Sequence, residues 1–258
     1  MDVDLDFNRV KIRTAKAMPS LIWRGRNGGK FKIGVSYESN EVDRTNGRFI
    51  SGLPADNPLF DKQDFYGVDA TYHFVNRDND AFPTLGFQTS LNIGYKNNVS
   101  TSKGFAYIIP ELGIDYKLIS SGQLVLATDL RAHINLGDDF EFYQAATIGA
   151  SNGLRGYRNQ RFTGKTAFVQ STDLRWNFGN LKTGLMPIHL GVYGGLDYGR
   201  VWIDDEFVIN PNTNNTNHWN TSIGGGIFAN LANMATLNLS AFSSDDNLRL
   251  AFRLGFGF

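Results

Sequence analysis

The sequence contains no cysteine and no long run of apolar residues. Without cysteine the chain can form neither a disulfide nor a thiolate metal site, and it is compatible with an oxidising compartment. No stretch approaches the ~18 consecutive apolar residues that a membrane-spanning helix needs. This absence does not exclude a membrane-embedded β-barrel, because a barrel carries its apolar surface on alternate residues of its strands.

Two further features are missing: an excess of charge of one sign, and a secretion signal. The 25 Lys and Arg residues balance the 25 Asp and Glu residues, which gives no electrostatic reason to expect nucleic acid as a partner. The first six residues, Met1 to Asp6, are acidic and lack the apolar core of a signal peptide. If the protein reaches an outer membrane, we expect that a leader was removed or that the chain is a fragment.

The final segment, residues 247–258, alternates strictly in character. Its even positions are Leu248, Leu250, Phe252, Leu254, Phe256 and Phe258, and its odd positions after Asn247 are Arg249, Ala251, Arg253, Gly255 and Gly257. Successive side chains of a strand point to opposite faces, so one face is wholly apolar and the other is small or cationic. We predict that this segment is the closing strand of a transmembrane β-barrel, with its even face in lipid.

The same alternation recurs upstream and predicts an all-β fold: one antiparallel transmembrane barrel domain, residues 1–258, of about twelve strands. Each predicted strand is near the ~9–11 residues that a tilted strand needs to cross a bilayer. The long connections (40–63, 137–164 and 204–217) fall on one side of this barrel, and the tight ones at 26–29 and 119–122 on the other. Outer-membrane barrels show this segregation, and their even strand number places both termini on one side.

The predicted inward face is too polar for a dry interior. It carries Lys32, Asp69, Gln88, Asn92, Asp115, Asp129, Arg131, Asp173, Arg175, Arg249 and Arg253. In a dry core each charge would cost several kcal/mol, whereas a wet lumen tolerates them. About twelve strands also enclose more space than side chains can fill, since ~8 strands is already the filled size. We therefore expect an inserted segment or water in the lumen.

The connection 137–164 holds the motif that carries a family resemblance. It contains Leu154-Arg155-Gly156-Tyr157, preceded by the aromatic pair Phe142-Tyr143 and the small residues Gly149-Ala150-Ser151. This stretch resembles the superfamily of outer-membrane protein insertases and two-partner secretion transporters, also called bacterial surface antigens. In that superfamily an [V/I/L]-R-G-[F/Y] tetrapeptide lies at the tip of a long extracellular loop that folds back into the lumen.

Three other stretches match the same superfamily. Gly195-Leu196-Asp197-Tyr198-Gly199 resembles its strand with an inward Asp, and Asp173-Leu174-Arg175 resembles its acidic-x-Arg strand, with Asp in place of the commoner Glu. The terminal aromatics, Phe256 and Phe258, resemble the signal that the barrel-assembly machinery reads. The resemblance covers roughly residues 64–258, and it implies that loop residue Arg155 meets Asp197, Gly199, Asp173 and Arg175 inside the lumen.

These residues also make a consistent physical hypothesis. An Arg155 carried into the lumen needs an anionic partner, and a bidentate pair with Asp197 would fix the position of the loop. Gly195 and Gly199 would clear space beside Asp197 for the incoming loop. Gly156 would permit a turn that a Cβ atom would block.

The resemblance implies a function in moving polypeptides across, or inserting them into, an outer membrane. Family members carry polypeptide-transport-associated domains before a barrel of sixteen strands, so this chain looks like the C-terminal part of such a barrel. The expected partners are outer-membrane lipid, the barrel-assembly machinery during biogenesis, and a polypeptide substrate or periplasmic partner. The weakest seam is expected between the first and last strands.

Other functions are consistent with the same sequence. A shortened barrel could anchor an attached domain, including an enzymatic one, or could act as a solute porin. His73, His133 and His189 read as inward but lack metal-ligand spacing. Ser90, Ser171 and Ser222 read as inward, whereas a lipid-cleaving nucleophile would face outward. We therefore predict no catalytic site, no metal and no cofactor.

Overall fold

The computed structural model describes residues 9–182, 186–203, 218–232 and 234–255. The long strands are β1 (Lys11–Ala17), β2 (Ser20–Arg24), β3 (Gly29–Asp43), β4 (Gln63–Arg77), β5 (Gly86–Asn98), β6 (Gly104–Lys117), β7 (Leu124–Leu136), β10 (Thr166–Lys182), β11 (Pro187–Trp202), β12 (Asn220–Leu231), β13 (Ala235–Ser243) and β14 (Leu248–Gly255). The connections contain a short strand pair, β8 (Ala146–Ile148) and β9 (Phe162–Gly164), and four 3₁₀ helices, η1 (Phe49–Gly52), η2 (Pro58–Phe60), η3 (Phe142–Gln144) and η4 (Ala150–Asn152). Within the described residues no helix is long and apolar enough to span a membrane.

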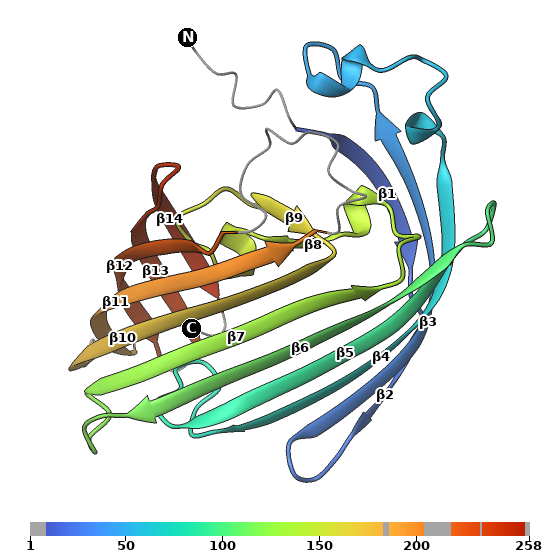
Figure 1. Ribbon diagram of the computed structural model, residues 1–258. Helices are drawn as coiled ribbons and strands as arrows, with labels where there is room; N and C mark the ends of the chain where they lie inside the picture. The colour runs from blue at the N-terminus through green and yellow to red at the C-terminus, as the bar shows by residue number, and fades with distance from the viewer. Residues whose placement is uncertain (1–8, 183–185, 204–217, 233, 256–258) are drawn as a thin grey trace.

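The long strands form one antiparallel sheet that curves around a concave side (Figure 1). Its order is β1-β3-β4-β5-β6-β7-β10-β11-β12-β13-β14, and β2 also pairs with β3. The predicted all-β antiparallel fold of about twelve strands is confirmed. The predicted closure is not observed, because over the described residues no ladder joins β14 to β1 or β2.

The reason for the open sheet lies at its first edge. β1 pairs with residues 37–43 of β3 and β2 pairs with residues 30–34, so the two short strands lie end to end along one neighbour. Pro19 separates them and has no N–H to donate to a ladder, and its carbonyl accepts a hydrogen bond from Val35 N at 3.2 Å. Eleven strands therefore lie side by side, and β2 lies off that path.

This count corrects the prediction of an even barrel with both ends of the chain on one side. With eleven strands side by side, the first and the last run in the same direction. An antiparallel ladder between β14 and the β1–β2 edge is therefore geometrically impossible, because antiparallel partners must run in opposite directions.

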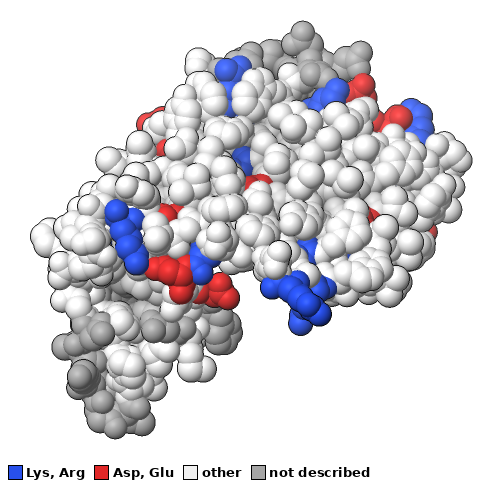
Figure 2. All heavy atoms as spheres, turned by 90° about the horizontal axis from the view of Figure 1, so that it is seen from below, with Lys and Arg blue, Asp and Glu red and all other residues white. Residues whose placement is uncertain are grey.

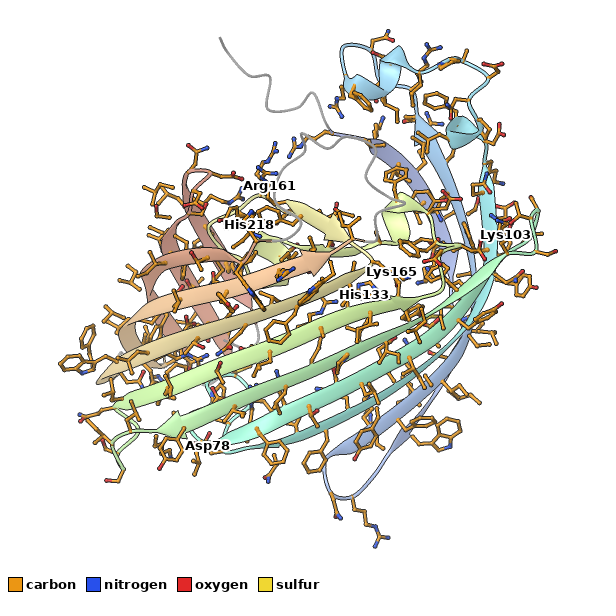
Figure 3. The ribbon with its side chains drawn as sticks, viewed as in Figure 1. Asp78, Lys103, His133, Arg161, Lys165 and His218 are labelled. Atoms are coloured by element: carbon orange, nitrogen blue, oxygen red, sulfur yellow. The ribbon has the colours of Figure 1, made fainter. Side chains whose placement is uncertain are left out.

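The long connections of the described residues lie at one end of the sheet and most short ones lie at the other, although the short connections 99–103 and 244–247 lie at the same end as the long ones. The end that we call the loop end carries residues 44–62 and 137–165, and the end that we call the turn end carries residues 25–28, 78–85 and 118–123. Figure 3 marks these ends, with Asp78 near the turn end and Lys103 and Arg161 toward the loop end. The predicted connection 204–217 lies outside the described residues.

The convex face carries exposed apolar side chains on the long strands from β3 to β14. On β14, Leu248, Leu250, Phe252 and Leu254 are each at least 65% exposed. Phe31, Ile33, Val35 and Tyr37 are also exposed on β3, next to the other edge of the sheet. Figure 2 shows a face of the molecule on which most residues are neither Lys, Arg, Asp nor Glu. Phe256 and Phe258 lie outside the described residues.

The concave face is polar, and its apolar clusters are small. Buried polar residues on the strands include Glu38, Asp69, Asp115, Asp173 and Asp197. The buried apolar side chains gather where connections fold inward onto the strands, as in the cluster of Leu154 and Tyr157 with Val169 and Val201. Over the described residues the sheet therefore has no second layer packed along its length, and connecting segments occupy part of its inner side.

Candidate functional site

The connection between β7 and β10, residues 137–165, folds over the concave face near the loop end (Figure 1). The β8–β9 pair forms its base, and Ile148 and Phe162 of that pair join Leu154 and Tyr157 in one buried cluster. Gly153 has a φ of +102°, in the left-handed region where glycine is favoured, and Ser171 donates a hydrogen bond to its carbonyl at 2.7 Å. These contacts deliver Arg155 to the wall of the sheet.

Arg155 binds the carboxylate of Asp197 through both its backbone and its side chain. Its backbone N–H donates to Oδ2 at 2.8 Å, Nε donates to Oδ1 at 2.9 Å, and Nη2 donates to Oδ1 at 2.6 Å. Ser222 donates to the same Oδ2 at 2.6 Å and accepts a hydrogen bond from Gly156 N at 3.1 Å. The carboxylate therefore holds two consecutive loop residues, one directly and one through Ser222.

Asp173 supplies a second carboxylate to the same guanidinium. Nη2 of Arg155 donates to Asp173 Oδ1 at 2.7 Å and Nη1 donates to Oδ2 at 3.1 Å, in the fork geometry that makes Arg–carboxylate pairs strong and directional. The guanidinium carbon also lies 4.0 Å from the ring centre of Phe242, within the range of a cation–π contact. Three strands, β10, β11 and β13, thus contact one loop side chain.

This pairing is largely removed from water. The side chains of Arg155, Asp173 and Asp197 are 14%, 11% and 0% exposed. Removal of one partner from such a pair leaves a buried charge and typically costs ~3–5 kcal/mol, compared with ~0–1 kcal/mol for an exposed pair. The two carboxylates hold the edge of the guanidinium and the Phe242 ring lies against its face, so the side chain is anchored in one position.

Glycines provide the space for this anchor. A Cβ atom on Gly195 would lie 2.4 Å from Asp173 Oδ1 and 2.6 Å from Arg155 Nη2. A Cβ atom on Gly199 would lie 3.2 Å from Ile148 Cδ1 of the loop. Gly156 lies in a turn of the loop, and a Cβ atom there would lie 2.6 Å from Ser222 Cβ, so close approach to β12 excludes a side chain at this position.

Arg175 takes a different position from the one that the resemblance implied. Its Nη1 donates to Asp115 Oδ1 on β6 at 3.2 Å and to the carbonyl of Pro83 at 3.5 Å, in the turn between β4 and β5. Asp115 also lies 2.9 Å from Nε of Arg77. Asp173 and Arg175 lie on the same face of β10, because side chains two residues apart point to the same side of a strand. Arg175 is the one nearer to the turn end, where it reaches Asp115 and Pro83 instead of the loop.

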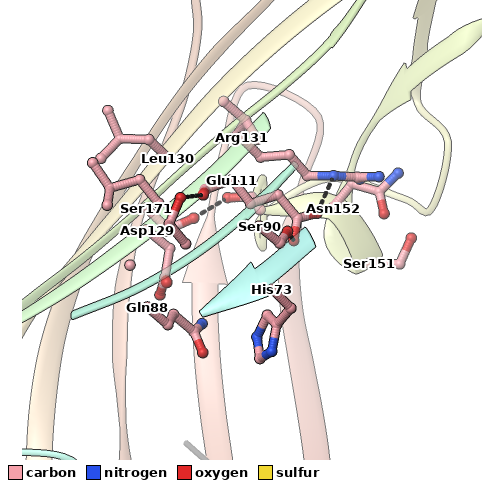
Figure 4. Close-up of a pocket in the computed structure, with 15 residues that line it drawn as sticks. His73, Gln88, Ser90, Glu111, Asp129, Leu130, Arg131, Ser151, Asn152 and Ser171 are labelled. Atoms are coloured by element: carbon pink, nitrogen blue, oxygen red, sulfur yellow. Dashed lines mark hydrogen bonds and ion pairs between the residues drawn. The ribbon is translucent and has the colours of Figure 1, made fainter. Parts of the chain in front are cut away.

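The inserted loop fills only part of the concave side. A cavity of about 430 Å³ lies between η4 and the wall, and it is lined by His73, Ser90, Asp129 and other polar residues (Figure 4). Within it, Arg131 Nε lies 2.9 Å from Glu111 Oε1. A second cavity of about 700 Å³ lies beside Arg155 and reaches β14. The concave side therefore holds an inserted segment with open space beside it.

The inward histidines lie in three separate places. His73 lines the cavity beneath η4, His133 lies beside Asn135 at 3.2 Å, and His189 stacks on Phe82. Among the described residues no three His, Asp or Glu side chains come close enough together to hold a metal ion. Ser222, which the sequence offered only as an inward serine, is instead a partner of Asp197. Its place beside Asp197 on the neighbouring strand follows from the register of β11 and β12.

Comparison with known proteins agrees with this architecture. No protein-family model matches the sequence, and no curated protein matches it. Among solved structures, the chain is similar to the crystal structure of BamA from Haemophilus ducreyi lacking POTRA domains 1–3, with a TM-score of 0.72 over 95% of this chain. The fold resembles the BamA barrel. At 13% identity this likeness concerns the fold alone, and this chain spans 55% of the length of that BamA chain.

Proposed function

We propose that this protein is an outer-membrane β-barrel of the surface-antigen and insertase superfamily, and that it takes part in translocating polypeptides or inserting them into the membrane. The observation that carries the proposal is the anchoring of Arg155, from an LRGY loop, on the strand residue Asp197 inside a BamA-like wall. A loop held by a desolvated ion pair can brace or plug a lumen, which an irregular exposed loop cannot do.

The two faces of the sheet support a place in a membrane. The convex face exposes apolar side chains on successive strands, and Tyr37, Tyr72, Tyr95, Tyr116 and Trp176 are exposed on the same face. Amphipathic rings of this kind favour the boundary between hydrocarbon and water. A soluble protein would leave this surface unprotected, because large apolar patches promote association in water.

The free edges of the sheet support a polypeptide as the partner. Over the described residues, β14 and the β1–β2 edge run in the same direction, from the loop end to the turn end. In a second copy with the same orientation in the membrane, both edge strands run in this same direction. They therefore cannot form an antiparallel ladder with the edge strands of the first copy. A strand that runs from the turn end to the loop end could add to either edge by ordinary β-augmentation.

Reconstitution tests this proposal. Liposomes that contain the protein should accelerate the insertion of an unfolded model barrel over empty liposomes, as followed by the protease resistance of the inserted product. Arg155→Ala should reduce the acceleration, because the loop loses its anchor. Arg161→Ala is the matched control, since Arg161 lies in the same loop and its partner Asp246 is partly exposed. Equal insertion with and without the protein would contradict the insertase role and favour a membrane anchor.

A further inference from the structure

The connection between β4 and β5, residues 78–85, also enters the concave side, from the turn end (Figure 1). Phe82 is 6% exposed and its ring centre lies 5.3 Å from that of Phe228 on β12. Thr236 on β13 donates to the carbonyl of Ala81 at 3.3 Å. The strands that carry this turn are far from β12 and β13 in the sheet order, so the turn crosses the concave side and joins two remote parts of the wall.

Local hydrogen bonds hold this turn in shape. Asn79 Oδ1 accepts from the backbone N–H groups of Ala81 and Phe82, both at 2.9 Å. Asp78 Oδ1 accepts from the N–H groups of Thr84 at 2.8 Å and Leu85 at 3.0 Å. Asn and Asp side chains that bond the backbone a few residues ahead are typical of rigid turns. The direction of Phe82 is therefore set before it meets the opposite wall.

The two inserted segments reach the same aromatic cluster. Phe82 belongs to one buried cluster with Phe228 of β12, Tyr193 of β11 and Phe242 of β13, and within it the Phe82 ring packs against Phe228. Arg155 lies over those rings from the loop side, 4.0 Å from the centre of Phe242 and 5.9 Å from the centre of Tyr193. The cluster thus lies between a segment from the loop end and a segment from the turn end.

We propose that the 78–85 turn is a brace that fixes the curvature of the open sheet and supports the rings on which Arg155 lies. A closed barrel holds its curvature by a continuous ladder of hydrogen bonds. This sheet has two free edges over the described residues, so contacts across the concave side must do this instead. Loss of the Phe82 contact lets the two parts of the wall move apart and loosens the loop anchor.

Spin labels on the outer face measure the separation of the two parts. The chain has no cysteine, so Tyr72→Cys on β4 and Leu239→Cys on β13, both exposed positions, provide a unique pair. In detergent we expect one narrow distance distribution for the otherwise unchanged protein. Phe82→Ala should broaden it and shift it to longer distances, whereas Asp80→Ala, at an exposed position of the same turn, should not. An unchanged distribution in Phe82→Ala would overturn the brace.

A cross-link tests the same contact if Phe82→Ala folds poorly. Ala81→Cys and Thr236→Cys are introduced together in Phe82→Ala and oxidised to a disulfide. The distance between the two outer-face positions is then measured with labels that do not react with cysteine. The disulfide should restore the narrow distance distribution. A formed disulfide that leaves the distribution broad would contradict the proposal. Thr236→Val removes the hydroxyl that donates to Ala81 and also accepts from Asn230 Nδ2 at 2.9 Å. It should give a smaller broadening than Phe82→Ala, and an equal or larger one would argue against the ring as the main contact.

Limited proteolysis tests the link to Arg155. Trypsin should cleave after Arg155 about tenfold faster in Phe82→Ala than in Asp80→Ala, because cleavage requires local opening of the loop. Equal cleavage rates would overturn the support of Arg155 by the brace. Both measurements use folded protein in detergent, so they remain informative even if the protein inserts no polypeptide.

Discussion

The two faces of the sheet are built from alternate residues of the same strands, yet they are stabilised differently. Leu250 on the convex face is 74% exposed, whereas Asp197 on the concave face is fully buried under a loop. The convex face has apolar side chains without a covering layer of described residues. The concave face has charged side chains, and each buried one needs a partner because an unpaired buried charge is very unfavourable.

This difference indicates where the stability of the molecule lies. In most domains an apolar face packs against a second layer, and stability is spread over many contacts. Here the convex face depends on its surroundings, and the concave face depends on a few anchored contacts made by two inserted segments. Substitutions on the two faces should therefore differ in their dependence on lipid, and the following predictions test that contrast from the largest expected effect to the smallest.

Asp197→Ala should give the largest loss on the concave face. The carboxylate accepts from Arg155 and from Ser222, so its removal leaves the buried guanidinium with one carboxylate partner, Asp173, in place of two. We expect the free energy of unfolding to fall by ~3–5 kcal/mol, as for other broken buried pairs. Urea unfolding should detect this in detergent and in lipid vesicles alike. Asp246→Asn, which breaks a partly exposed pair in the same region, should cost no more than ~1 kcal/mol.

Leu250→Arg tests the convex face. In a bilayer an outward cation costs ~2–4 kcal/mol near the midplane, so unfolding from vesicles should become easier by that amount. Met234→Arg is the control, because Met234 is equally exposed but lies in the turn at one end of the sheet. If Leu250→Arg were neutral in vesicles, the convex face would not meet lipid and the contrast between the two faces would fail.

Gly195→Ala and Gly194→Ala compare the two faces at adjacent residues. The new Cβ atom at position 195 would lie 2.4 Å from Asp173 Oδ1, whereas at position 194 the nearest atom would be 3.9 Å away. We expect Gly195→Ala to cost ~1–3 kcal/mol through forced displacement of the ion pair. Gly194→Ala should be close to neutral in the same unfolding assay. Equal effects would show that the anchor tolerates expansion.

Acid titration should give the smallest effect. Partial burial acts to raise the pKa of Asp78, but hydrogen bonds from Thr84 and Leu85 and the nearby Lys117 together hold that pKa below its ordinary value. A lowered carboxyl pKa contributes stability above the unfolded-state pKa of ~3.9, and this stability is lost as the pH falls through the folded-state value. We expect Asp78→Asn to weaken the protein at pH 7 and to match it at pH 2, as measured by unfolding across that range.

Much of the fold and part of the site could be predicted from local patterns. The alternation predicted that Leu248, Leu250, Phe252 and Leu254 face outward, since strand periodicity depends only on the backbone. The tetrapeptide around Arg155 and the strand around Asp197 indicated both partners of the ion pair. The brace could not be predicted, because Phe82 lies in a polar turn whose direction depends on its approach to strands more than 100 residues away.

The sequence by itself therefore determined the strands, their two faces and the residues able to anchor a loop, because periodicity and charge are local properties. Only the tertiary structure decided that the sheet stays open, since this follows from β1 and β2 sharing one neighbour. It also decided that Arg175 pairs with Asp115 and that Phe82 reaches β12. Each of these outcomes depends on which segments come into contact in the folded sheet, and no local sequence pattern specifies contacts between segments that are far apart in the chain.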